Sequence, residues 1–153
     1  MVKKMKELVC TFFGHRKDLP EQLHEEVEKA IMDLIQVYGV SKFYVGNEGK
    51  FDWLIAQVLQ KLQKEFLHIN TEVVLAYLPP KKDKNTRNTL ATLYPEEVAK
   101  APKRFAICRR NDWMLKQADF VLCYVKYVGG GARQFMEKAE RQKKRVINLA
   151  EKI

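Results

Sequence analysis

Three glycine-containing segments of the sequence carry side chains that suit the binding of an anion. The first is Gly14-His15-Arg16, which follows an apolar run from Leu8 to Phe13. Glycine lets a ligand approach the backbone closely, and the guanidinium fork of Arg16 matches a phosphate or a carboxylate. The same residues also fit a plain turn with an exposed basic pair. The segment is therefore a candidate ligand-binding turn, with Gly14, His15 and Arg16 as its members.

The second segment spans residues 46–52 and reads GNEGKFD. Two glycines between a strand-like run and a helical run leave backbone amides free to face an anion at a helix N-terminus. Asp52 fits two roles, a helix N-cap or an acceptor for a ribose hydroxyl. The spacing differs from the G-x-G-x-x-G fingerprint, so it does not support a classical NAD site, and we expect no cofactor. The candidate ligand-binding residues are Gly46, Asn47, Glu48, Gly49 and Asp52.

The third segment is Gly129-Gly130-Gly131, between a strong apolar run and the last helical run. Three successive glycines cost conformational entropy, and a simple connection needs at most two. We infer that a ligand lies against this backbone with its phosphate near the helix start. Arg133 adds positive charge there. Glu137 lies one turn further on, where it fits a ligand contact or an ordinary surface position.

The pair Arg110-Asn111 precedes a predicted short helix. Asn111 fits an N-cap and Arg110 an exposed cation, or the pair supplies a charged fork and an amide to the binding crevice. Trp53 and Trp113 each follow an aspartate at a helix start. We expect both tryptophans to pack in a core or an interface rather than to stack on a base.

The elements that position these residues alternate between strand-like and helical hydrophobic periods. The stretch 81–103 is polar, carries two prolines and shows weak periodicity, which predicts a functional loop or lid. The pattern predicts strands at 8–13, 42–45, 71–78, 119–125 and 145–149, and helices at 20–39, 51–66, 111–117 and 132–144.

This alternation predicts one domain over residues 1–153, an α/β Rossmann-like three-layer sandwich with a mostly parallel sheet. The near-continuous apolar strands agree, because parallel strands are covered on both faces. In such folds ligands bind outside the carboxyl ends of the strands. The three glycine-containing segments all follow predicted strands, so we expect them to meet at one edge of the sheet.

Composition narrows the possible partners. Lysine and arginine outnumber the acidic residues by 28 to 19, a formal charge of +9, which favours phosphorylated ligands or nucleic acid. The excess is scattered along the chain, as on solvated surfaces. The three cysteines lack metal-ligand spacing, so we expect buried reduced thiols and no metal site. Apolar runs are too short to span a membrane, and we expect a cytoplasmic protein.

The motifs together resemble the SLOG superfamily, in particular its small stand-alone bacterial and phage branch. The resemblance implies a Rossmann-like fold that binds nucleotides or nucleotide-derived ligands, and a homodimer. Relatives include cytokinin-activating phosphoribohydrolases, a DNA-processing protein that loads single-stranded DNA, and anti-phage sensor domains. The segments that carry it are 11–16, 46–52, 110–114 with 118–119, and 129–131 with Ala139 and the ending 146–149.

The phosphoribohydrolase signature Pro-Gly-Gly-x-Gly-Thr-x-x-Glu is only partly present. Gly130, Gly131 and Glu137 match it. Gly129 replaces the proline, Arg133 the later glycine and Gln134 the threonine. The missing glycine and threonine would hold phosphate in that family, so the resemblance leaves catalysis open.

Three functions follow as hypotheses. The first is a nucleotide-ligand site that acts as a sensor or as a weak N-glycosidic hydrolase, with Glu137 and Asp52 as catalytic candidates. Arg16, Arg110 and Arg133 would then hold phosphate. The second is binding of single-stranded nucleic acid. The third is a partner-binding module that uses the 81–103 segment.

Overall fold

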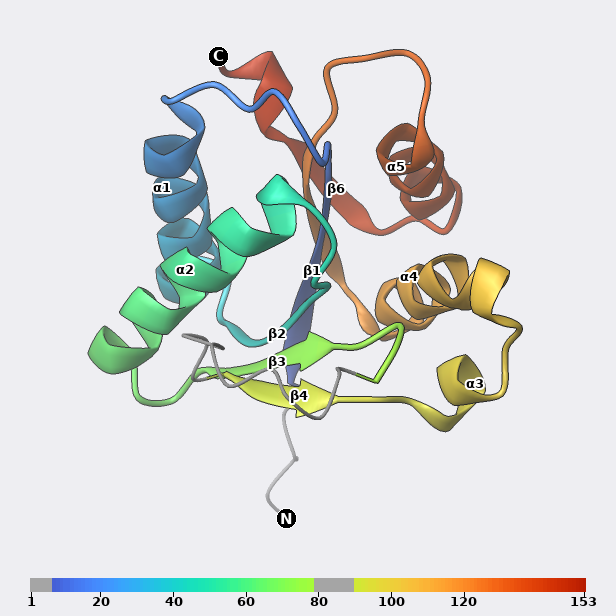
Figure 1. The fold of residues 1–153 in the computed structure, drawn as a ribbon. Helices are drawn as coiled ribbons and strands as arrows, with labels where there is room; N and C mark the ends of the chain where they lie inside the picture. The colour runs from blue at the N-terminus through green and yellow to red at the C-terminus, as the bar shows by residue number, and fades with distance from the viewer. Residues whose placement is uncertain (1–6, 79–89) are drawn as a thin grey trace.

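The computed structural model describes residues 7–78 and 90–153, and these form a three-layer α/β fold around one parallel sheet (Figure 1). The sheet has six strands in the order β4-β3-β2-β1-β5-β6, and every adjacent pair is parallel. The predicted fold class is confirmed. The strands are β1 (Leu8–Gly14), β2 (Val40–Val45), β3 (Asn70–Val74), β4 (Ala91–Leu93), β5 (Phe120–Tyr124) and β6 (Arg145–Asn148).

Helices cover both faces of the sheet. Two long helices, α1 (Leu23–Gln36) and α2 (Lys50–Glu65), pack together on one face. On the other face lie α4 (Ala106–Gln117) and α5 (Gly131–Arg141). Short helical segments complete the layers: α3 (Glu96–Ala99) and the single 3₁₀ turns η1 (Lys103–Phe105) and η2 (Leu149–Glu151). No helix in the described ranges is long and apolar enough to cross a membrane.

Strand β1 is buried on both faces, which explains its unbroken apolar sequence. On the α1–α2 face Phe12 stacks on Phe43 with ring centroids 6.1 Å apart. On the opposite face Phe13 stacks on Phe135 of α5 at 5.3 Å. Successive side chains of a strand point to opposite faces, so two adjacent phenylalanines serve two separate cores.

The sheet has its switch point beside β1. From β1 the chain adds β2, β3 and β4 on one side, then returns to place β5 and β6 on the other. The crevice outside the carboxyl ends of β1 and β5 is where ligands bind in open α/β sheets. The side chain of Asn148 pairs with the backbone just after β5. It accepts a hydrogen bond from Val125 N and donates one to Val125 O, both at 3.0 Å.

Several predicted boundaries are wrong in the described part of the chain, including the strand predicted to reach residue 78, which ends at Val74. The expected loop at 81–103 contains β4 and α3, while 81–89 lie outside the described residues. Strand β4 has only three residues at the sheet edge, which are too few to show the hydrophobic alternation that predicts a strand. Helix α4 begins at Ala106, not at Asn111. Its buried face includes Arg110, and a buried arginine interrupts the apolar pattern that predicts a helix.

A glycine sets how closely α2 approaches β1. A β-carbon added at Gly14 would lie 2.3 Å from the ring of Phe51, the second residue of α2. Gly14→Ala should destabilise the protein by about 1–3 kcal/mol through overpacking. Thermal denaturation should show a Tm lower by about 2–4 °C for each kcal/mol. The control is Gly129→Ala, where an added β-carbon meets nothing within 4 Å. Equal Tm values for the two variants would contradict this account.

Candidate functional site

A cavity of about 500 Å³ lies at the carboxyl ends of the central strands. This volume falls within the ~300–1,000 Å³ typical of small-molecule sites. The end of β1, the start of α2, the η1–α4 segment and the start of α5 all contribute to its wall. The lining residues are Phe12, Phe13, Gly14, His15, Arg16, Glu48, Asp52, Arg104, Ile107, Cys108, Arg110, Asn111, Gly130, Gly131, Ala132, Gln134 and Phe135.

Arg110 is the most buried charged residue in this wall, with only 2% of its surface exposed. Its Nε donates to Asn111 Oδ1 at 3.0 Å, and its Nη1 donates to Asn47 Oδ1 at 3.1 Å and to Val74 O at 3.2 Å. Nη2 has no hydrogen-bond partner among the described residues, and no carboxylate there forms an ion pair with the guanidinium. Burial lowers the pKa of Arg110, but an arginine stays charged at neutral pH. A buried cation therefore presents unused donors to the cavity.

Gly46, at the end of β2, makes room for the charged groups of the cavity. A β-carbon there would lie 2.7 Å from Asp52 Oδ2 and 2.9 Å from Arg110 Cζ. Any side chain at this position would displace one of the two. The predicted residues Gly46 and Asn47 therefore lie behind the cavity wall, where they support Arg110 rather than line the space.

Asp52 lies in the first turn of α2 and lines the cavity. It is the third helical residue, and the positive φ of +96° at Gly49 starts the helix, so Asp52 is not the N-cap. Its Oδ2 accepts a hydrogen bond from Glu48 N at 3.0 Å. Burial raises the pKa of Asp52 to about 6, while the charge of Arg110 acts in the opposite direction. A carboxyl with this pKa exchanges its proton near neutral pH, which makes it a candidate functional group.

The turn after β1 joins two parts of the site. His15 Nε2 accepts from Lys126 N at 2.8 Å and from Tyr127 N at 3.3 Å. Burial and the charge of Arg133 lower the pKa of His15, which favours the neutral ring. Because Nε2 accepts two hydrogen bonds, the proton of that ring is on Nδ1. Arg16 is exposed, and its carbonyl accepts from Lys50 N at 3.0 Å. The backbone of this turn is thus held against α2, and the exposed Arg16 side chain borders the cavity.

The glycine triplet borders the cavity with two of its members, Gly130 and Gly131. Gly130 has a φ of +105° and precedes the first residue of α5. Arg133 and Glu137 do not line the cavity. Arg133 Nε donates to Tyr127 O at 2.9 Å, and Arg133 Nη1 lies 3.7 Å from Glu137 Oε1. The structure therefore brings Asp52, and not Glu137, to the cavity.

Several residues that line the cavity were not among the site residues predicted from the sequence. Arg104, Ile107 and Cys108 come from the η1–α4 segment, whose helix start was predicted too late. Cys108 is exposed, contrary to the expectation of buried thiols, whereas Cys10 and Cys123 are buried and burial raises the pKa of both. No group of three or more potential metal ligands occurs in residues 7–78 and 90–153.

Six parallel strands with the switch point at β1, and helices on both faces, define a Rossmann-like α/β fold. Among solved structures the chain is similar to DNA processing protein A from Streptococcus pneumoniae, with a TM-score of 0.65 and 18% identity over 92% of this chain. It is also similar to DNA processing protein A from Helicobacter pylori, whose structure is described as showing a single-stranded DNA binding mode. That match has a TM-score of 0.62 and 14% identity over 91% of this chain.

The chain spans 49% and 63% of the lengths of these two proteins. No family model and no curated protein matches the sequence. At these identities the likeness is one of fold. It agrees with the Rossmann-like fold that the SLOG resemblance implies.

The raised pKa of Asp52 predicts a distinct pH dependence of stability. The folded-state pKa of about 6 lies above the ordinary value of 3.8, so the folded protein takes up this proton first as the pH falls. Asp52→Asn lacks this group. The stability of the wild type relative to the variant should be constant above about pH 7. It should then rise by up to about 3 kcal/mol as the pH falls from 6 to 4.

Urea denaturation of both proteins at a series of pH values measures this difference, and the titration of all other groups cancels to a first approximation. Glu137→Gln serves as the matched carboxylate control, because Glu137 is exposed outside the cavity. A wild-type-to-variant difference that stays flat from pH 7.5 to pH 4 would show that Asp52 titrates normally.

Proposed function

We propose that this chain binds single-stranded DNA and that the strand-end cavity holds one nucleotide unit of the strand through its phosphate. The observation that carries the proposal is the Arg110 guanidinium, a buried cation with unused donors on the wall of a cavity. Asp52 and Glu48 act on this charge without forming an ion pair with it, and a buried charge without a direct ionic partner is costly. A bound phosphate would supply both the counter-charge and acceptors for Nη2.

The surroundings of Arg110 support an anionic ligand. Arg16 and Arg104 contribute two further cations to the lining, against the carboxyls of Glu48 and Asp52. The N-termini of α2 and α5 both begin at a glycine beside the cavity, and helix N-termini favour phosphate. Protonation of Asp52 near pH 6 would remove one of the opposing charges, so anion affinity should increase as the pH falls through 6.

Two observations favour a strand of nucleic acid over a free ligand. The formal charge of +9 suits a polyanion, and phosphate contacts dominate nucleic-acid affinity. The fold is similar to that of DNA processing protein A from Helicobacter pylori, which has a single-stranded DNA binding mode. Binding of one nucleotide unit in the cavity would let the rest of the strand follow the cationic surface outside it.

A free nucleotide or nucleotide-derived ligand is the second candidate, favoured by the small volume of the cavity and by Asp52. A carboxyl with a pKa of about 6 could position or activate water for N-glycosidic cleavage. This candidate uses the same Arg110 donors, so it differs from the first in the length of the ligand and in whether a bond is broken.

Binding of a fluorescein-labelled 20-nucleotide dT strand, followed by anisotropy at 50 mM salt, tests the first proposal. Arg16→Ala should weaken binding about 10-fold and make the salt dependence shallower by about one contact, because an exposed phosphate contact is lost. Arg110→Met should weaken binding at least as much. Its melting temperature should also fall, because methionine leaves Asn47 Oδ1 and Val74 O without their donor and removes the charge that acts on Asp52 and Glu48. Binding is therefore compared well below the melting temperature of the variant.

Arg141→Ala is the matched control, because Arg141 is an exposed arginine of α5 outside the cavity. The strand should also slow modification of Cys108 by a thiol reagent, since that thiol lines the cavity and is exposed. Wild-type affinity in both Arg16→Ala and Arg110→Met would overturn the proposal.

Thermal shift and product analysis with AMP, GMP and NAD test the second candidate. A free nucleotide that binds the native state should raise Tm in the wild type and not in Arg110→Met. If the site cleaves its ligand, free base or nicotinamide should accumulate in the wild type and be lost in Asp52→Asn. Unchanged Tm and no released base with all three compounds would eliminate this candidate.

A further inference from the structure

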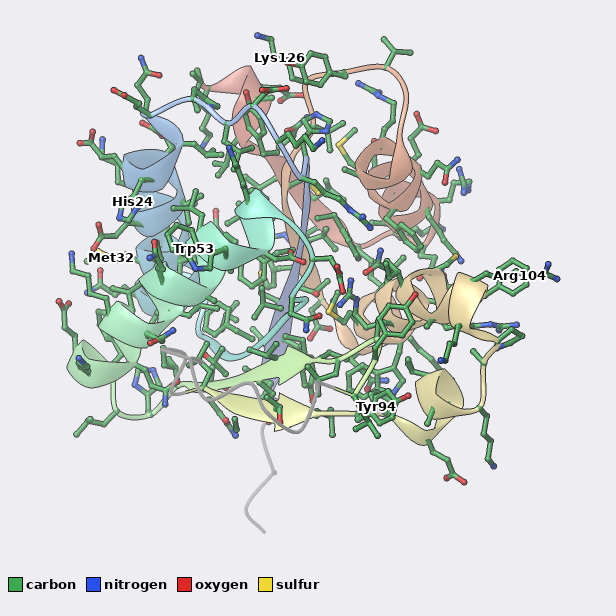
Figure 2. The ribbon with its side chains drawn as sticks, in the orientation of Figure 1. His24, Met32, Trp53, Tyr94, Arg104 and Lys126 are labelled. Atoms are coloured by element: carbon green, nitrogen blue, oxygen red, sulfur yellow. The ribbon has the colours of Figure 1, made fainter. Side chains whose placement is uncertain are left out.

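A second concave surface adjoins the cavity, a groove between the start of α1 and the start of α2. The residues that line it come from the β1–α1 connection and from the first turns of the two helices. These groove residues are Arg16, Lys17, Leu19, Pro20, Glu21, His24, Gly49, Lys50, Trp53 and Leu54. In Figure 2, His24 on α1 and Trp53 on α2 lie on the same side of the molecule.

Trp53 is 65% exposed in this groove, so of the two expected positions, a core or an interface, the core is wrong within the described chain and the interface stays a prediction. Trp113 behaves as expected, since it is partly buried and packs edge-on against Tyr44 with ring centroids 5.0 Å apart. Leu19, Pro20 and Leu54 give the groove an apolar wall beside the exposed indole. An aromatic ring in an open apolar groove can accept a second flat ring on its face.

The charges around the groove favour an anionic occupant. Arg16, Lys17 and Lys50 are cationic, and Glu21 is the one acidic residue among those that line it. A hydrophobic peptide or a lipid chain would gain nothing from these cations. A nucleotide combines both requirements, because its base is flat and apolar on its faces and its phosphate is anionic.

The groove and the cavity are neighbours, because Arg16 lines both. The hydrogen bond from Lys50 N to Arg16 O fixes the backbone between them. We propose that the groove holds the base of the nucleotide next to the one in the cavity, stacked on Trp53, with the intervening phosphate at Arg16 and Lys50. This subsite rests on the proposed DNA binding and adds a base-stacking platform to it. Stacking on an aromatic side chain tolerates any base, so the platform is not sequence-selective.

The test compares the mononucleotide pdT with the dinucleotide pdTpdT, using intrinsic tryptophan fluorescence and calorimetry. In the wild type the dinucleotide should bind about 10-fold more tightly than the mononucleotide and quench the fluorescence more strongly, because stacking occurs only with the second base. Trp53→Ala should remove most of this gain, leaving the part that comes from the phosphate at Arg16 and Lys50, and should leave mononucleotide affinity unchanged. Trp53→Phe should retain most of the gain, since a phenyl ring also stacks. Leu67→Ala, which truncates an exposed apolar side chain just after α2, is the control.

The outcomes separate this subsite from the cavity. If Trp53→Ala keeps the full dinucleotide gain while Arg110→Met loses binding of both ligands, the groove proposal is wrong and the cavity proposal stands. If Arg110→Met binds both ligands normally, the cavity proposal is wrong. A second copy of this chain is the other possible occupant of the groove, and sedimentation equilibrium tests for it. If Trp53→Ala turns a dimer into a monomer without changing dinucleotide affinity, the groove is an interface between two copies and the proposal is overturned.

Discussion

The burial of one guanidinium organises this end of the molecule. Arg110 reaches from α4 to the ends of β2 and β3, where it bonds Asn47 Oδ1 and Val74 O. These bonds hold α4 against the switch point and leave no space for a side chain at Gly46. The remaining donors of Arg110 face the cavity, so the group that ties the elements together is also the group best placed to bind an anion.

Much of the fold is encoded in local patterns, and the site only partly so. Unbroken apolar strands that end in Gly14, Gly46 and the 129–131 triplet predict a parallel sheet with its site at the strand ends, because that sheet is covered on both faces. The sequence indicates Arg110 as a candidate phosphate ligand, but its burial was not predictable in this way. A cation in the middle of a helix usually marks a solvated face, and only the tertiary packing shows that this one is buried.

The division of the site among four elements bears on its chemistry. The cationic groups come from the β1 turn and the η1–α4 segment, whereas the carboxyls Glu48 and Asp52 come from the start of α2. Glu137, the acid that the phosphoribohydrolase signature would supply, is paired with Arg133 outside the cavity. The cavity therefore holds three arginines and two carboxyls but lacks the glutamate of that signature, which favours recognition of an anion over cleavage of the phosphoribohydrolase type.

The hydrogen bond between Lys50 N and Arg16 O bears on the distance between two parts of this surface. Backbone atoms, and not side-chain rotamers, set the separation between the cavity and the groove that Arg16 joins. The two concave surfaces therefore lie at a fixed separation. Under the proposed binding mode a mononucleotide would occupy only one of them, and a strand would have to be long enough to reach both.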